Sequence, residues 1–312
     1  MPHFADQLFE AIAAKDAAPV CVGIDPVFER LPAGLQQERE DSPAGRVDAV
    51  FEFVMELLEI VAPLVPCVKL QSACFERYGP DGVQAYYSLT EAAVSRDLIV
   101  IGDAKRGDIG TTAAHYAVAT LTDPGPYNDP DMPDDDDADD LVSPDAVTVN
   151  PYFGDDGLRP FLEVALQEEK GVFALVRTSN PGGDAIQALM LNDGRTVAEA
   201  VAELVADLGS DSRYLGQSGY SLLGAVVGAT KPDDAARLRK IMPRQIFLVP
   251  GFGAQGGSIE DIRPCFNADK RGALITASRS ITYAFAQQPD TDWRDAVAAA
   301  TRDMKKQVTS IF

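Results

Sequence analysis

The sequence has little histidine, few cysteines and no long apolar run. Only two histidines occur in 312 residues, so there is almost no material for a histidine-rich metal site or a Ser-His-Asp triad. The four cysteines are scattered and form no CxxC pair, which is typical of free thiols in a reducing cytosol. No apolar run reaches membrane-spanning length and the N-terminus lacks a signal-peptide pattern, so we expect a soluble, cytoplasmic protein with no membrane partner.

Positive charge is also in short supply. The chain has 27 Lys and Arg residues against 48 Asp and Glu, a net charge of −21. A field of that sign repels nucleic acid, so we expect no nucleic-acid partner, and any phosphate site must be positive locally. Such an acid excess is typical of adaptation to a salty cytoplasm, although an ordinary acidic protein also shows it.

Short apolar runs alternate with helical patterns along the chain. An amphipathic segment at 4–14 comes first, and helix-compatible stretches such as 47–62 separate the later runs. Eight continuous apolar runs predict strands buried on both faces, at 20–25, 65–71, 98–105, 146–152, 171–178, 222–229, 245–251 and 272–278. This alternation favours an α/β fold, one (β/α)8 TIM-barrel domain over residues 1–312 with an N-terminal helix; a doubly wound open sheet is the alternative.

One segment departs from this pattern. Residues 123–144 are rich in Asp and Pro and include four consecutive aspartates at 134–137. We interpret the segment as a solvated acidic loop insertion. Because it leads from a helix into the predicted fourth strand, we expect it on the face of the barrel that lies opposite the active site.

Polar residues gather at the predicted strand ends, above all after the third strand. There the chain reads Asp103-Ala-Lys105-Arg-Gly-Asp108-Ile109-Gly-Thr-Thr112. Alternation sends Asp103 and Lys105 to the same side, into the barrel mouth where such folds keep their active sites. A lysine flanked by carboxylates stays protonated, so the pattern predicts an ammonium acid beside fixed negative charge.

A second group of features suits a phosphate. The segment 250–257 reads Pro-Gly-Phe-Gly-Ala-Gln-Gly-Gly, and its glycines allow backbone amides to approach an anion closely. Gln255 adds a side-chain donor, and Arg279 supplies a planar guanidinium after the eighth strand. Barrel enzymes often bind phosphate with the loops that follow strands seven and eight.

The segment 103–112 resembles the D-x-K-x-x-D-I-x-x-T signature of orotidine 5′-phosphate decarboxylases. Further features follow in that family's order, from about residue 20 to about residue 281: Asp25, Lys69, Ser179, the loop with Pro250, Gln255 and Gly256, and Arg279. The forms Val68-Lys69-Leu-Gln71 and Asn150-Pro-Tyr-Phe-Gly154 are similar to the longer, type 2 branch of the family.

The resemblance implies an enzyme that converts orotidine 5′-phosphate to uridine 5′-phosphate in de novo pyrimidine biosynthesis, with no metal and no cofactor. It implies that Lys105 stabilises and protonates a carbanion at C6, that Asp103 faces the substrate carboxylate, and that Lys69 and Asp108 complete the catalytic set. It also implies a homodimer in which Asp108 and Thr112 enter the neighbouring subunit's site. The substrate-binding residues that it implies are Asp25, Ile109, Thr112, Ser179, Pro250, Gln255, Gly256 and Arg279.

Two alternatives stay open at this point. Magnesium-dependent sugar-phosphate decarboxylases and synthases of the same barrel group share the D-x-K-x-x-D hexamer, but they place a metal-binding glutamate near the second strand, where this chain has Lys69. The other alternative is a barrel that binds a phosphorylated ligand without turnover, against which the presence of both Asp103 and Lys105 argues.

Overall fold

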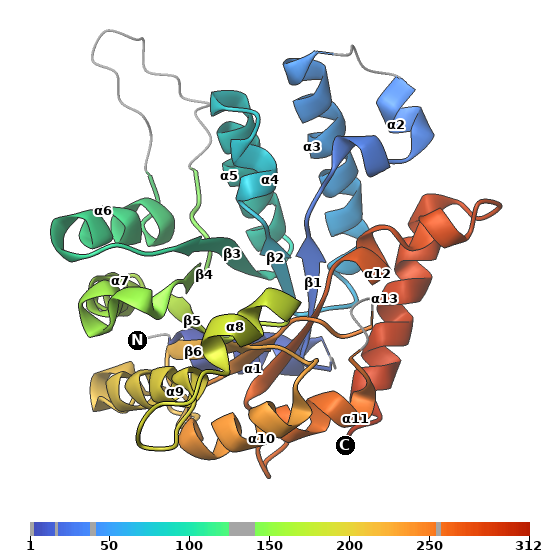
Figure 1. The fold of residues 1–312 in the computed structure, drawn as a ribbon. Coiled ribbons are helices and arrows are strands. Elements are labelled where there is room, and N and C mark those ends of the chain that lie inside the picture. The colour runs from blue at the N-terminus through green and yellow to red at the C-terminus, as the bar shows by residue number, and fades with distance from the viewer. Residues whose placement is uncertain (1–2, 16–17, 38–41, 125–140, 254–256) are drawn as a thin grey trace, which may run out of the picture.

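Eight parallel strands close into a barrel in which each strand pairs with the next and β8 pairs back with β1 (Figure 1). The structure is a computed structural model that describes residues 3–15, 18–37, 42–124, 141–253 and 257–312. The predicted (β/α)8 barrel is confirmed, and the open sheet is not observed. The strands are β1 (Val20–Ile24), β2 (Cys67–Leu70), β3 (Ile99–Arg106), β4 (Ala146–Val149), β5 (Gly171–Arg177), β6 (Leu223–Val227), β7 (Phe247–Val249) and β8 (Ala273–Ala277).

Helices surround the barrel and connect successive strands (Figure 1). The longer ones are α1 (Phe4–Ala14), α3 (Pro43–Val61), α5 (Pro80–Val94), α6 (Gly110–Leu121), α7 (Asp155–Gln167), α9 (Val197–Leu208), α10 (Pro232–Ile241) and α13 (Trp293–Thr309). One-turn helices lie in the connections: α2 (Ala33–Gln37), α4 (Ala73–Glu76), α8 (Asp184–Gln187), α11 (Ile259–Ile262) and α12 (Arg279–Thr282). No helix in the described ranges is long and apolar enough to cross a membrane.

Seven of the predicted apolar runs contain one of these strands, and the third covers β3 except for its last residue, Arg106. The β1 residues are buried throughout, as expected of parallel strands covered on both faces. The predicted runs extend one to three residues further at most ends, since residues such as Asp25 and Gln71 leave the strand ladder and enter the loops at the barrel mouth. Both residues line the cavity at the barrel mouth.

The predicted N-terminal helix is α1, and it packs against the N-terminal end of β5. The Phe4 ring meets the Phe173 ring edge-on, with 5.8 Å between their centroids. Gly171 makes this contact possible, because a Cβ at that position would lie 2.4 Å from the Phe4 ring. The helix thus covers apolar surface on the side of the barrel away from the mouth.

Strand β3 is irregular where it reaches the mouth. Gly102 lies opposite Val147 of β4, whereas Arg106 lies opposite Val149, so four steps along β3 match two along β4. This bulge includes Lys105, whose φ of +50° is a left-handed conformation that a residue with a side chain seldom adopts. Bulges of this kind redirect side chains next to active sites.

The acidic segment 123–144 joins α6 to β4, the connection that the sequence predicted for it. Residues 125–140 lie outside the described residues. At the two ends that are described, Asp123 accepts hydrogen bonds from the Ser143 backbone N–H at 2.9 Å and from Lys170 Nζ at 3.0 Å. These contacts hold the start and the finish of the segment together.

A buried arginine joins α10 to the ends of β7 and β8. Arg239 is 7% exposed and donates hydrogen bonds to the carbonyls of Met242, Gln245, Cys265 and Gly272. Its guanidinium also lies 3.5 Å from the centre of the Phe247 ring. Burial lowers the pKa of Arg239 to about 10, which still leaves it charged at neutral pH.

We predict that Arg239→Met lowers the free energy of unfolding by about 3 kcal/mol, because buried carbonyls lose charged donors. Urea denaturation measures this difference. The control is Arg213→Met, which removes an arginine that is largely exposed and paired with Asp211, and it should cost less than about 1 kcal/mol. Equal losses in the two variants would contradict the structural role of Arg239.

Candidate active site

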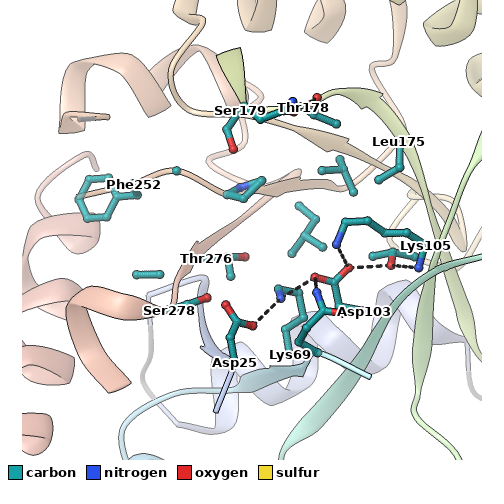
Figure 2. A pocket seen from close by; sticks show the side chains of 18 of the residues that line it. Asp25, Lys69, Asp103, Lys105, Leu175, Thr178, Ser179, Phe252, Thr276 and Ser278 are labelled. Atoms are coloured by element: carbon teal, nitrogen blue, oxygen red, sulfur yellow. Dashed lines mark hydrogen bonds and ion pairs between the residues drawn. The ribbon is translucent and has the colours of Figure 1, made fainter. Parts of the chain in front are cut away.

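A cavity of about 370 Å³ opens at the C-terminal ends of the strands, where the sequence predicted the site. Figure 2 shows that Asp25, Lys69, Asp103 and Lys105 gather on one wall of the cavity, and that Thr178 and Ser179 lie across from them. The lining residues are Asp25, Lys69, Gln71, Asp103, Lys105, Thr148, Leu175, Thr178, Ser179, Asn180, Val226, Leu248, Pro250, Gly251, Phe252, Thr276, Ala277, Ser278 and Arg279.

A buried carboxylate joins two lysines on the charged wall (Figure 2). Lys69 Nζ donates to Asp103 Oδ2 at 2.7 Å, and Lys105 Nζ donates to Asp103 Oδ1 at 2.6 Å. The side chains of Lys69 and Asp103 are 8% and 7% exposed, whereas that of Lys105 is 44% exposed. Of these three charged residues, Lys105 is therefore the one whose side chain is accessible to a ligand.

Two neutral side chains complete the surroundings of Asp103. Thr148 Oγ1 donates to Asp103 Oδ1 at 2.8 Å, and Gln71 Nε2 donates to Oδ2 at 3.1 Å. The Thr148 hydroxyl also accepts the Lys105 backbone N–H at 3.0 Å. A carboxylate has about four acceptor sites, so the two lysines, Thr148 and Gln71 use all of them and fix its orientation.

The charges of this group stabilise one another. Burial alone would raise the pKa of Asp103, but Lys69 and Lys105 outweigh it and hold the pKa well below its usual value. Burial would likewise lower the pKa of Lys69, yet Asp103 and Asp25 raise it above its usual value. At neutral pH the buried pair is therefore fully ionised.

Asp25 continues the charged wall on the other side of Lys69. Its Oδ1 lies 3.6 Å from Lys69 Nζ, an ion pair too long to be a good hydrogen bond. The loop that carries Asp25 is held by the Tyr283 hydroxyl, which donates to the Asp25 carbonyl at 3.0 Å and accepts the Val27 N–H at 2.8 Å. Among the described His, Cys, Asp and Glu residues, no group of three or more gathers as a metal-binding set.

Ser179 lines the cavity on a turn that is held from behind by a buried arginine. Arg177, at the end of β5, is 2% exposed and forms ion pairs with Asp184 and with Asp234, the latter at 2.7 Å. Gln187 accepts the Thr178 backbone N–H at 2.9 Å. This network ties the turn to α8 and α10 and so fixes the position of Ser179.

The phosphate end of the site is described in part. Pro250, Gly251 and Arg279 line the cavity, as predicted, whereas Gln255 and Gly256 lie outside the described residues. Gly251 has a φ of +98°, which only glycine adopts readily. Arg279 is exposed at the edge of the cavity, so its guanidinium is accessible to an anion.

Three of the predicted site residues do not line this cavity. Asp108, Ile109 and Thr112 come at the start of α6, where Asp108 Oδ1 accepts the Ile109 N–H at 2.8 Å. Ile109 and Thr112 are exposed. None of the three therefore contributes to the described wall of this cavity.

Sequence reasoning missed six polar residues that line the cavity: Gln71, Thr148, Thr178, Asn180, Thr276 and Ser278. Gln71 could have been found, because it lies two residues after Lys69 and alternation points both the same way. A threonine inside an apolar run was the only signal for Thr148 and Thr276. Asn150, the first residue after β4, does not line the cavity; its side-chain oxygen accepts the Tyr152 N–H at 3.1 Å.

Comparison with known proteins agrees with this geometry. The model of the orotidine 5′-phosphate decarboxylase / HUMPS family matches residues 18–295. The chain is 43% identical to an orotidine 5′-phosphate decarboxylase of Rhodopirellula baltica and 35% identical to one of Caldicellulosiruptor bescii, with 99% of each chain covered in both cases.

Solved structures agree as well. A putative orotidine-monophosphate-decarboxylase from Toxoplasma gondii matches with a TM-score of 0.79 and 30% identity, over 99% of this chain and 96% of that one. A putative orotidine 5′-phosphate decarboxylase from Streptomyces avermitilis matches with a TM-score of 0.77 and 32% identity, over 100% and 96%. The predicted family is confirmed: this chain belongs to the orotidine 5′-phosphate decarboxylase / HUMPS family.

Proposed function

We propose that this chain is a decarboxylase that converts orotidine 5′-phosphate to uridine 5′-phosphate in pyrimidine biosynthesis, and that its whole length forms one catalytic barrel domain. The observation that carries the proposal is the buried carboxylate of Asp103 between Lys69 and Lys105, beside an open cavity. Support comes from relatives that bear this name and match along their full length.

The reaction needs a cation next to the pyrimidine ring. Loss of CO2 breaks the bond between C6 and the carboxylate carbon and leaves the electron pair on C6, where the ring delocalises it poorly. Catalysis must then stabilise charge at the place where it develops. The exposed ammonium of Lys105 does this and donates a proton to C6, after which solvent restores the proton to Lys105.

Asp103 has two roles in this proposal. It holds the Lys105 ammonium in place through a 2.6 Å hydrogen bond. Its lowered pKa keeps it ionised. In this proposal it lies next to the substrate carboxylate, so the two negative charges repel each other. That repulsion disappears when neutral CO2 leaves, which lowers the barrier relative to the bound substrate.

The rest of the nucleotide follows the cavity wall. We assign the ribose to Asp25 and Lys69, and the amide edge of the pyrimidine to Ser179. The phosphate is assigned to the loop at Pro250 and to Arg279, with Gln255 and Gly256 as further proposed ligands.

Lys105→Ala tests the assignment of the proton donor. We expect the variant to bind uridine 5′-phosphate measurably but to lose decarboxylation almost completely, because no other ammonium is open to C6. Loss of substrate absorbance measures the rate, and titration calorimetry measures binding. Lys270→Ala, which removes an exposed lysine that does not line the cavity, is the control and should keep the wild-type rate. Appreciable turnover by Lys105→Ala would refute the role.

Arg279→Ala tests the phosphate assignment. We expect KM for orotidine 5′-phosphate to rise about 10-fold to 100-fold, as for the loss of charged hydrogen bonds, while turnover of unphosphorylated orotidine stays unchanged. Arg302→Ala, on the exposed side of α13, serves as the control. An equal loss for both substrates would mean that Arg279 does not hold the phosphate.

We further propose a homodimer in which Asp108 and Thr112 reach into the neighbouring subunit's site. Both residues lie outside the cavity of their own subunit. Large apolar side chains are exposed around them, on α6 and on the turn after β4, and exposed apolar surface of this kind marks interfaces. They are Ile109, Tyr116, Val118, Tyr152 and Phe153, with exposures from 37% to 82%.

Mixing two inactive variants tests the shared site. We expect Lys105→Ala and Asp108→Asn each to have little activity, and a mixture that exchanges subunits to recover about a quarter of the wild-type rate. The reason is that half of the random dimers are mixed, and one of the two sites in each is intact. Lys105→Ala mixed with Asp103→Asn is the control, because those two defects never leave an intact site. No recovery in the first mixture would contradict the shared site.

A further inference from the structure

Two buried polar atoms in the cavity have no hydrogen-bond partner. Among the described residues, only four buried side-chain oxygens lack one, and two of these, Asp25 Oδ1 and Thr276 Oγ1, belong to residues that line the cavity. The others are Tyr78 Oη and Gln245 Oε1, which do not line it. Burying a hydroxyl without a partner is unfavourable, so an unpaired one that faces a ligand site indicates a partner on the ligand.

Thr276 differs in this respect from the other inward threonine of the barrel. The hydroxyl of Thr148 is fully used, since it donates to Asp103 and accepts the Lys105 N–H. Thr276 is 3% exposed, and valine has the same shape without a hydroxyl that must be satisfied. Packing alone therefore does not explain a threonine on β8 at this position.

The place of Thr276 in the barrel indicates which part of a nucleotide it meets. It lies on β8, three residues before Arg279, and β8 pairs with β1, the strand that leads into Asp25. Figure 2 shows the Thr276 hydroxyl, Ser278 and the Asp25 carboxylate on the same side of the cavity. Going from β8 through β1 to β2 and β3, the wall presents Arg279, then Thr276 and Asp25, then Lys69 and Asp103. If the phosphate of a nucleotide lies at Arg279 and its pyrimidine lies beside Asp103, its ribose lies between them, next to Thr276 and Asp25.

We propose that Thr276 is a further substrate-binding residue, whose hydroxyl donates a hydrogen bond to a ribose hydroxyl that in turn donates to Asp25 Oδ1. A ribose hydroxyl suits both atoms, because a carboxylate only accepts and a threonine hydroxyl also donates. The Lys69 ammonium, 3.6 Å from Asp25 Oδ1, leaves that oxygen free to accept. The inference rests on the proposed function, since it takes the ligand to be a nucleoside 5′-monophosphate.

Thr276→Val tests the inference, because it removes the hydroxyl and little else. With uridine 5′-monophosphate as the probe, we expect Kd from calorimetry to rise about threefold to tenfold, the effect of one hydrogen bond. The urea midpoint of the ligand-free protein should stay equal or rise, since an unpaired buried hydroxyl is lost. Thr276→Ser, which keeps the hydroxyl, should bind as the wild type does.

Analogues identify the hydroxyl group. The analogues are 2′-deoxyuridine 5′-monophosphate and 3′-deoxyuridine 5′-monophosphate. The analogue that lacks the hydroxyl bound by Thr276 should bind the wild type and Thr276→Val with equal Kd. The other analogue should still bind Thr276→Val more weakly than the wild type. Thr301→Val, whose buried hydroxyl donates to the Val297 carbonyl in α13, is the matched control and should leave Kd unchanged.

Two results would overturn the inference. One is an unchanged Kd for uridine 5′-monophosphate in Thr276→Val. The other is a lower urea midpoint together with an equal loss for the nucleotide and both analogues, which would make Thr276 structural. A wild-type protein that neither binds the nucleotide nor decarboxylates its precursor would instead refute the proposed function, so the two failures are distinguishable.

Discussion

The site depends on one carboxylate that is ionised where water scarcely reaches it. Asp103 is 5% exposed, and a buried charge of this kind is stable only if it is paired and fully hydrogen-bonded. Here β2 supplies Lys69, β4 supplies Thr148, and the bulge in β3 turns Lys105 back toward the same carboxylate. These contacts form only if β2, β3 and β4 pair in the observed register. The charged group around Asp103 therefore requires the closed barrel.

The same arrangement explains how a protein with a large negative net charge can bind an anionic ligand. The charged side chains that line the cavity are Lys69, Lys105 and Arg279 against Asp25 and Asp103, a sum of +1 in a protein whose total is −21. A ligand with a phosphate and a carboxylate therefore meets a locally favourable field inside a repulsive one. Within the cavity the charges are also separated in space, with the lysines on β2 and β3 and the arginine after β8.

Much of the fold could be predicted, because strands buried on both faces appear as continuous apolar runs, and Asp103 and Lys105 could be placed by alternation. The bulge at Lys105 could not, since it arises from pairing with β4 and leaves no local signature. Thr148 and Thr276 show the same limit: a single threonine in an apolar run suits packing and hydrogen bonding equally, and only neighbours from other strands distinguish them. The two ion-pair partners of Arg177 lie 7 and 57 residues further along the chain, so its role behind Ser179 could not be predicted from the sequence.

The central claim is that protein side chains alone, organised around Asp103, remove CO2 from the nucleotide. Its most direct test is the loss of orotidine 5′-phosphate absorbance with purified protein in the presence of EDTA, in low and in multimolar potassium chloride. The account predicts rapid loss that the chelator does not affect; a dependence on salt would add support for an acidic surface adapted to high salt. No loss by demonstrably folded protein under either condition, or loss that EDTA abolishes and magnesium restores, would contradict it.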